Sequence, residues 1–168
     1  MNPISKYWLY RRQNYVRELI KVRTSRILDI GCGENKIFPT AIGLDVYPYS
    51  GVDKIGSAEN LPFANKSFDI VTMLEVIEHL DNPEKALKEI YRVLKRNGKV
   101  IISTPNVTLV WKIIWLFWSN TIGRKWKGYH SKEFDKNGLV SLLSKYFKII
   151  YLGIVNKWIL VVVGQKIK

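Results

Sequence analysis

The sequence predicts an α/β fold, a mostly parallel sheet with helices on both of its faces. Apolar runs with strand character alternate with helical patterns along most of the 168 residues. The first strand runs into a glycine-spaced turn, Asp29-Ile30-Gly31-Cys32-Gly33, and the second ends on an acid, Asp45. Two β-rich runs close the chain on either side of Asn156-Lys157, which is typical of a tight hairpin that inverts the last strand. These observations indicate seven strands with an antiparallel C-terminal hairpin.

The first elements follow from local patterns. Residues 5–23 predict an amphipathic helix, because Lys and Arg separate apolar residues at helical spacing. Short apolar strands are expected at 26–30 and 41–45, and a turn rich in Pro, Ser and Gly leads to a third strand at 52–55. The apolar positions of the helix include Tyr7, Tyr15, Leu19 and Val22.

The middle of the chain continues the alternation. An apolar run at 67–73 predicts the fourth strand, and Pro83 opens a helix to about residue 94, since proline suits the first helical position. Asn97-Gly98 turns the chain into a fifth strand at 99–103, which Pro105 ends. The inner face of the helix is expected to hold Ala86, Leu87, Ile90 and Leu94.

The last part contains an unusually apolar segment, residues 107–118, with three tryptophans at helical spacing. It is too short to span a bilayer. The favoured interpretation of this segment is a lid over a ligand pocket. The alternatives are a helix that lies in a lipid interface and a dimer contact. A helix at 131–145 and strands at 147–155 and 158–164 complete the fold. The tryptophans are Trp111, Trp115 and Trp118.

The net charge of +13 is unevenly placed: +6 in residues 1–26, −2 in 27–106 and +9 in 107–168. Basic flanks favour an acidic substrate, an anionic membrane surface or nucleic acid, and a solvated lysine-rich surface is the plain alternative. Cys32 is the single cysteine, which excludes an internal disulfide and fits a reducing cytoplasm. No secretory signal is expected, because basic residues interrupt any early apolar run.

The glycine turn and Asp45 together predict a nucleoside site. Ligands of such sheets bind at the carboxyl ends of the strands, where both features fall. Glycine allows the backbone to pass close to a ligand, and an acid at the end of the next strand can accept hydrogen bonds from both ribose hydroxyls.

Several blocks follow one another along the chain: Leu28–Gly33, Gly43–Asp45, Ser57–Phe63, Ser67–Val71, Glu75–Leu80, Glu89–Lys95 and Ser103–Asn106. Taken in this order, they resemble the class I S-adenosylmethionine-dependent methyltransferases, in particular the small-molecule branch that includes ubiquinone-biosynthesis methyltransferases. The resemblance is dense over about residues 26–106 and looser beyond. It implies a Rossmann-like seven-stranded sheet and S-adenosyl-L-methionine as the cofactor.

The resemblance assigns roles to residues of these blocks. Gly31 and Gly33 would let the backbone approach the methionine part of the cofactor, and Asp29 would hold its amino group. Asp45 would accept from the ribose hydroxyls. Ser57 and Ala58 would flank the adenine, while Leu74 and Glu75 would line the methionine side. The expected cofactor-binding set is Asp29, Gly31, Cys32, Gly33, Asp45, Val46, Ser57, Ala58, Glu59, Leu74 and Glu75.

Three positions depart from the family pattern. Asn35 stands about where a third glycine is usual, and Ser57 stands where relatives commonly carry an acid. A hydroxyl accepts a hydrogen bond more weakly than a carboxylate, so the contact to the adenine amino group is expected to be weaker. Pro39 interrupts the short connection to the second strand, which leaves room for little more than one turn of the usual first crossover helix.

By the same resemblance, Glu78 and His79 would face the transferred methyl or the acceptor. Methyl transfer from a sulfonium is a direct displacement, and a hydroxyl acceptor also needs a base, for which histidine suits neutral pH. His79 is the leading candidate, and orienting the loop before Pro83 is its alternative role. His130 is expected to anchor a loop. Cys32 is interpreted as a small buried filler, and no metal site is expected because no third ligand accompanies the two glutamates.

We expect one domain over residues 1–168, with a basic helix (1–25), a cofactor-binding core (26–106), an acceptor-side insertion (107–130) and a C-terminal helix and hairpin (131–168). Three functions compete. The first is a cytoplasmic methyltransferase acting on a small-molecule or lipid-like acceptor. For this enzyme, a homodimer and a peripheral contact of residues 107–127 with the inner membrane surface are both possible. The second is a methyltransferase for RNA or another polyanion, which is not favoured, and the third is a non-catalytic cofactor-binding interaction subunit.

Overall fold

The sheet has the strand order β3-β2-β1-β4-β5-β7-β6, and every neighbouring pair is parallel except the two that involve β7. The computed structural model describes residues 3–20, 26–106 and 133–167. The arrangement confirms the predicted fold class. The strands are β1 (Ile27–Ile30), β2 (Ile42–Asp45), β3 (Lys54–Ile55), β4 (Phe68–Leu74), β5 (Leu94–Pro105), β6 (Lys148–Val155) and β7 (Ile159–Gln165).

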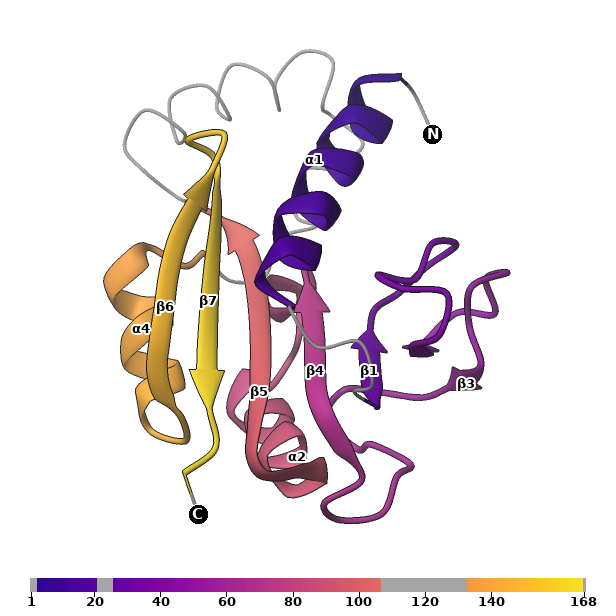
Figure 1. Ribbon diagram of the computed structural model, residues 1–168, viewed down its shortest axis with the longest axis vertical. Helices are drawn as coiled ribbons and strands as arrows, with labels where there is room; N and C mark the ends of the chain where they lie inside the picture. The colour runs from indigo at the N-terminus through magenta and orange to yellow at the C-terminus, as the bar shows by residue number, and fades with distance from the viewer. Residues whose placement is uncertain (1–2, 21–25, 107–132, 168) are drawn as a thin grey trace.

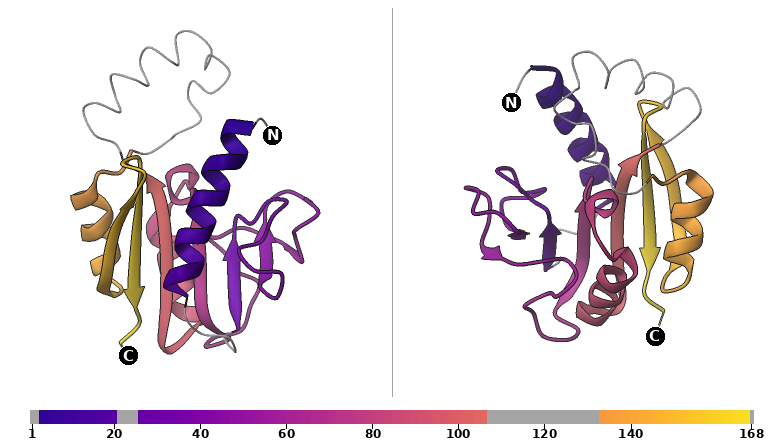
Figure 2. Two further views of the ribbon diagram at one scale, coloured as in Figure 1. Left: turned by 45° about the horizontal axis from the view of Figure 1, so that its top comes forward. Right: turned by 180° about the vertical axis from the view of Figure 1, so that it is seen from behind.

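The central strands are apolar because helices cover both faces of the sheet. α1 (Pro3–Leu19) lies on one face, and α2 (Pro83–Val93) and α4 (Lys136–Ser144) lie on the other (Figures 1 and 2). Alternate side chains of β4 serve the two cores: Val71 packs in the cluster on the α2 side, and Ile70 packs in the cluster on the α1 side.

The ends of α2 are fixed by polar contacts. At the N-terminus the Asn82 side chain caps the helix by accepting a hydrogen bond from the backbone N–H three residues on. At the C-terminus the buried ammonium of Lys166 donates to the carbonyl oxygens of Tyr91 (2.6 Å) and Leu94 (2.8 Å). A cation there satisfies the last carbonyls of the helix and ties α2 to the end of β7.

The closing hairpin forms as the sequence predicts. Asn156 and Lys157 have φ values of 50° and 66°, and positive φ at both central residues is the requirement of a type I′ turn. The Trp158 N–H donates to the Val155 carbonyl at 3.1 Å. The turn returns the chain as β7, which inserts antiparallel between β5 and β6.

The connection from β1 to β2, residues 31–41, contains no helical residue. It therefore lacks even the single helical turn that was expected there. α1 packs against this connection instead. Gln13 donates to the Asn35 carbonyl at 3.0 Å, and Arg17 donates to the Ile37 carbonyl at 2.6 Å. Ile37 is fully buried in the cluster on the α1 side. The N-terminal helix thus covers the sheet where a crossover helix would otherwise lie.

Some boundaries differ from the prediction. Tyr7 was expected on the apolar face of the first helix, but it is 55% exposed, and Val16 and Ile20 are buried there instead. β3 has two residues, both exposed, because it pairs with β2 alone at the edge of the sheet. β5 begins at Leu94, directly after α2, rather than at residue 99. α4 begins at Lys136 and not at 131.

Candidate functional site

A cavity of about 690 Å³ opens at the carboxyl ends of β1, β2 and β4. Its volume lies in the range of small-molecule sites, about 300–1,000 Å³. The glycine turn, the segment after β2, the loop after β3 and the segment after β4 form its walls. The residues that line it are Ile30, Gly31, Leu44, Asp45, Val46, Tyr47, Tyr49, Gly56, Ser57, Ala58, Glu59, Glu75, Val76, His79, Leu80 and Asp81.

The glycine turn has the backbone that its sequence requires. Gly31 and Gly33 have φ values of 70° and 55°, in the left-handed region that favours glycine. A Cβ atom on Gly31 would lie 2.2 Å from Val76 Cγ2, while none of the described atoms lies within 4 Å of a Cβ position on Gly33. Gly31 is therefore needed for packing within the protein, and Gly33 leaves open space beside the turn.

Asp45 joins the glycine turn to the end of β2. Its Oδ2 accepts from the Gly33 N–H at 3.0 Å, and its Oδ1 accepts from the Tyr47 N–H at 3.1 Å. A carboxylate has about four lone-pair sites, so each oxygen retains capacity for a further donor. Val46, which lies between Asp45 and Tyr47 in the sequence, is 57% exposed and presents an apolar surface on the same wall.

Asp29 lies behind the turn rather than on the cavity wall. It is 4% exposed; its Oδ1 accepts from the Thr72 hydroxyl at 2.6 Å and its Oδ2 from the Ile37 N–H at 2.7 Å. Burial raises the pKa of Asp29, and these two hydrogen bonds oppose the shift. By accepting from the Ile37 N–H, Asp29 holds the helix-free connection against the end of β1.

Cys32 also faces away from the cavity. Its thiol is buried and donates to the Gly51 carbonyl at 3.4 Å, and burial raises its pKa to about 11. A thiol that stays protonated at neutral pH is a poor nucleophile. This agrees with the interpretation of Cys32 as a buried filler.

The loop after β3, residues 57–66, contributes Ser57, Ala58 and Glu59 to the cavity wall; we call it the wall loop. The Ser57 hydroxyl accepts from the Glu59 N–H at 3.1 Å, and the Ala58 side chain is buried in the core. The Glu59 carboxylate reaches away to accept from the Asn82 N–H at 2.8 Å, at the start of α2. Glu59 therefore lines the cavity and also anchors the wall loop.

The segment after β4 supplies the third wall. Glu75 adopts a positive φ of 58°, and its carboxylate accepts from the Ser103 hydroxyl at 2.9 Å. Glu78 and His79 belong to the short helix η1 (Ile77–His79). His79 is exposed and lines the cavity, whereas Glu78 is 2% exposed and accepts from the Thr104 hydroxyl at 3.1 Å. Burial, reinforced by the nearby charge of Glu75, raises the pKa of Glu78 to about 8.

Arg12, on α1, reaches the same edge of the sheet, which no sequence pattern indicated. Its Nη1 lies 3.9 Å from Glu75 Oε2, and its buried Nε has no hydrogen-bond partner among the described residues. Burial raises the pKa of Asp29, Glu75 and Glu78, and the positive charge of Arg12 opposes the shift in each. Arg12 thus places a positive charge beside these three acids.

Leu74 packs in the core cluster on the α1 side and does not line the cavity. His130 and the tryptophan-rich segment lie outside the described residues, so their predicted roles as a loop anchor and an acceptor wall remain predictions.

Comparison with known proteins supplies the family. A family model described as "Methyltransferase domain" matches residues 7–146. The chain belongs to this methyltransferase family. The match begins within α1 and covers every strand from β1 to β5, so all the residues that line the cavity lie within it. The family resemblance drawn from the sequence blocks is confirmed.

The relatives of this methyltransferase domain agree with the family. A ubiquinone biosynthesis O-methyltransferase from Pseudomonas putida is 27% identical over 120 residues, which cover 56% of this chain and 50% of that protein. A probable S-adenosylmethionine-dependent methyltransferase from Mycobacterium tuberculosis is 29% identical over 159 residues, covering 83% of this chain and 55% of that one. The chain spans about half the length of the curated relatives it matches.

Solved structures share the fold. The crystal structure of a SAM-dependent methyltransferase, possible histamine N-methyltransferase, from Thermotoga maritima has a TM-score of 0.70 at 24% identity and covers 97% of this chain and 94% of its own. Within the described parts of the methyltransferase domain, no three His, Cys, Asp or Glu side chains gather closely enough to hold a metal ion. None of the helices described there combines the length and apolar character needed to cross a bilayer.

Proposed function

We propose that this chain is an S-adenosyl-L-methionine-dependent methyltransferase that transfers the methyl group by direct displacement to a small-molecule or lipid-like acceptor. S-adenosyl-L-methionine is the cofactor that the family membership implies. The observation that carries the proposal is the composition of the cavity, whose walls bring together Asp45, the glycine turn and His79.

The cavity residues fit the nucleoside part of this cofactor. Each Asp45 oxygen keeps a lone pair beyond its backbone contact, which suits the two adjacent hydroxyls of a ribose. The exposed side chain of Val46 provides an apolar surface for a base, and the Ser57 hydroxyl retains one accepting lone pair and its proton.

The other end of the cavity fits the methionine part. The Glu75 carboxylate suits an ammonium group, and Arg12, which faces Glu75, suits a carboxylate through its forked donors. Asp29 supports this end from behind the wall by holding the segment that follows the glycine turn. The bound cofactor supplies an electrophilic methyl group, and the protein aligns the acceptor and excludes water.

His79 is the residue that we assign to proton removal from a hydroxyl acceptor. It lines the cavity and is exposed, whereas Glu78 lies behind the wall. With its pKa at about 8, Glu78 carries a proton at neutral pH and adds no negative charge beside Glu75. The O-methyltransferase activity in the name of the Pseudomonas putida relative supports a hydroxyl-bearing acceptor.

Calorimetry with S-adenosylhomocysteine tests cofactor binding. Asp45→Asn removes the charge that accepts from the ribose, and hydrogen bonds to charged groups contribute about 1.5–3 kcal/mol, so Kd should rise roughly 10- to 150-fold. Glu84→Gln, which changes an acid on α2 that does not line the cavity, is the matched control and should leave Kd unchanged. Absence of binding by the wild type, or equal Kd values for wild type and Asp45→Asn, would overturn the proposal.

The acceptor class is tested with S-adenosylmethionine labelled in its methyl group. The protein is incubated with a lipid extract, an aqueous small-molecule extract and total RNA in separate reactions. Label in either of the first two supports the proposal, and label in RNA would replace the acceptor with a polyanion. Tight cofactor binding without transfer in any reaction would point to a non-catalytic subunit.

A further inference from the structure

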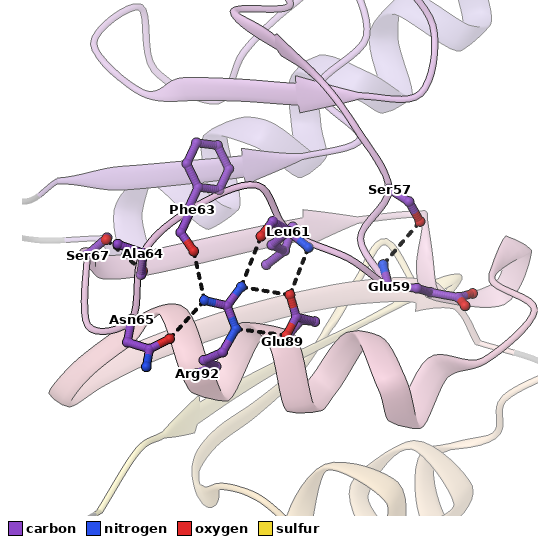
Figure 3. Close-up of polar contacts among 9 residues, drawn as sticks. All are labelled: Ser57, Glu59, Leu61, Phe63, Ala64, Asn65, Ser67, Glu89 and Arg92. Carbon is purple, nitrogen blue, oxygen red and sulfur yellow. Dashed lines mark hydrogen bonds and ion pairs between the residues drawn. The ribbon is translucent and has the colours of Figure 1, made fainter.

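Arg92, in the last turn of α2, uses every N–H of its guanidinium on the wall loop and on Glu89 (Figure 3). Nη1 donates to the Phe63 carbonyl at 2.7 Å and to Asn65 Oδ1 at 2.9 Å, and Nη2 donates to the Leu61 carbonyl at 2.9 Å. Nε and Nη2 bind the two Glu89 oxygens at 2.8 and 2.7 Å. Three acceptors of the wall loop are thus held by one side chain.

Glu89 completes the arrangement. Its Oε2 accepts from the Leu61 N–H at 2.8 Å, so both the N–H and the carbonyl of Leu61 are bound from α2. The hydrogen bond from Arg92 lowers the pKa of Glu89, which keeps the pair charged at neutral pH. Arg92 and Glu89, together with the wall-loop atoms that they bind, form what we call the α2 clasp.

Other supports of the wall loop are the burial of Ala58 and Leu61 in the core and a backbone hydrogen bond at its far end, where the Lys66 N–H donates to the Arg92 carbonyl at 3.0 Å. β3, which precedes it, is two exposed residues long and pairs only with β2. The second anchor is again on α2, where the Glu59 carboxylate accepts from the Asn82 N–H at 2.8 Å. α2 therefore supplies most of the side-chain hydrogen bonds that hold the wall loop, beside the burial of Ala58 and Leu61 in the core.

The same helix also begins four residues after His79, at Pro83, with Asn82 as its N-terminal cap. We infer that Arg92 is a positioning residue: through the α2 clasp it sets the wall loop against the nucleoside end of the cavity, at a fixed distance from His79. This inference rests on the proposed function for the identity of the ligand. Neither Arg92 nor Glu89 lines the cavity, so both act through the wall loop.

Arg92→Lys tests the α2 clasp. Lysine keeps the charge but has three donors at one point in place of five in a planar fork, so it cannot reach all five acceptors. The ligands are S-adenosylhomocysteine and 5′-methylthioadenosine, which has the base and ribose but lacks the amino-acid part. We expect Kd to rise about tenfold for both ligands in Arg92→Lys. In Arg12→Lys, at the methionine end, Kd should rise for S-adenosylhomocysteine alone.

Arg96→Lys is the control, because Arg96 lies four residues further along the chain and is exposed. This variant should bind both ligands like the wild type. In turnover, Arg92→Lys should raise KM for S-adenosylmethionine and leave kcat nearly unchanged, because contacts to the nucleoside are the same before and during transfer. A purely structural role would lower the melting temperature without changing Kd of the folded protein. Unchanged Kd values for both ligands would overturn the inference.

Hydrogen exchange of the ligand-free proteins separates this inference from the proposed function. Amides of residues 57–66 should exchange at least tenfold faster in Arg92→Lys than in wild type, whether or not a nucleoside binds. Equal exchange would overturn the α2 clasp itself, while faster exchange in a protein that binds no nucleoside would overturn the proposed function alone. If Arg92→Lys does not fold, Glu89→Gln, which retains one amide oxygen, should show the same changes to a smaller degree.

Discussion

Lys166 offers a quantitative test of how α2, and with it the wall loop, is held in place. The side chain is 5% exposed; its ammonium donates to the carbonyls of Tyr91 and Leu94 and lies 4.3 Å from the centre of the Tyr91 ring. Lys166→Met keeps an unbranched side chain of similar length but removes the charge and both hydrogen bonds.

The magnitude follows from these contacts. Two hydrogen bonds from a charged donor contribute about 3–6 kcal/mol together. Burial lowers the pKa of Lys166, which shows that the charged form is partly destabilised and offsets some of this gain. We therefore expect Lys166→Met to reduce the free energy of unfolding by about 2–4 kcal/mol, which corresponds to a fall in melting temperature of roughly 5–15 °C for a domain of this size.

Urea unfolding followed by circular dichroism measures the change, with an unaltered m-value indicating that the native and denatured states keep their compactness. Lys148→Met removes an exposed lysine from β6 and is the matched control, expected to change the free energy of unfolding by less than about 0.5 kcal/mol. Equal unfolding free energies for the two variants would refute the argument that the buried ammonium holds the end of α2.

Three further predictions concern the site. Burial raises the pKa of Glu78 from 4.5 to about 8, so between these pH values the folded protein holds a proton that the unfolded chain has lost. The free energy of unfolding should therefore fall as pH rises from about 5 to 8. Glu78→Gln should flatten this dependence in unfolding measured from pH 5 to 9. Gly31→Ala should lower stability by about 1–3 kcal/mol, because its Cβ meets Val76, and Val76→Ala should restore part of the loss. Asp29→Asn weakens the hydrogen bonds with Thr72 and Ile37, so it should lower the free energy of unfolding by about 1–3 kcal/mol and speed amide exchange in residues 31–41. Unchanged exchange there would contradict the role of Asp29 in holding this connection.

The sheet was predictable because its strands carry their signals locally. Apolar runs such as β1 and β4 are buried on both faces, and the alternation of strands with helices implies parallel pairing. The type I′ hairpin was also predictable, since Asn156 tolerates positive φ better than most residues. β3 was overestimated because two residues at a sheet edge have almost no pattern of their own.

α1 shows where periodicity is insufficient. The helix was predicted, and Tyr15 and Leu19 pack against the cluster on the α1 side as expected. The position of Tyr7 was wrong, because tyrosines are amphipathic and can stand on either side of such a helix. Tyr7 is exposed, and Val16 is fully buried. The role of α1 in covering the helix-free connection depends on contacts of Gln13 and Arg17 with segments about twenty residues away, which no local pattern encodes.

The candidate site was predictable to the extent that topology places it. Asp45 ends β2, Ser57 follows β3 and His79 follows β4, and a parallel sheet brings the ends of those strands to one edge. Arg12 was missed because a helix far away in sequence delivers it. Arg92 had a detectable signal, its three-residue spacing from Glu89 on a helix, but the acceptors of its other donors lie in a loop whose path the sequence does not determine.

The most direct test of the central claim is a crystal structure with S-adenosylhomocysteine bound. The account predicts that both ribose hydroxyls lie within hydrogen-bonding distance of the Asp45 carboxylate, with the base against the wall loop and the amino-acid part toward Arg12 and Glu75. Ligand bound away from this cavity, or bound within it with the ribose remote from Asp45, would contradict the account.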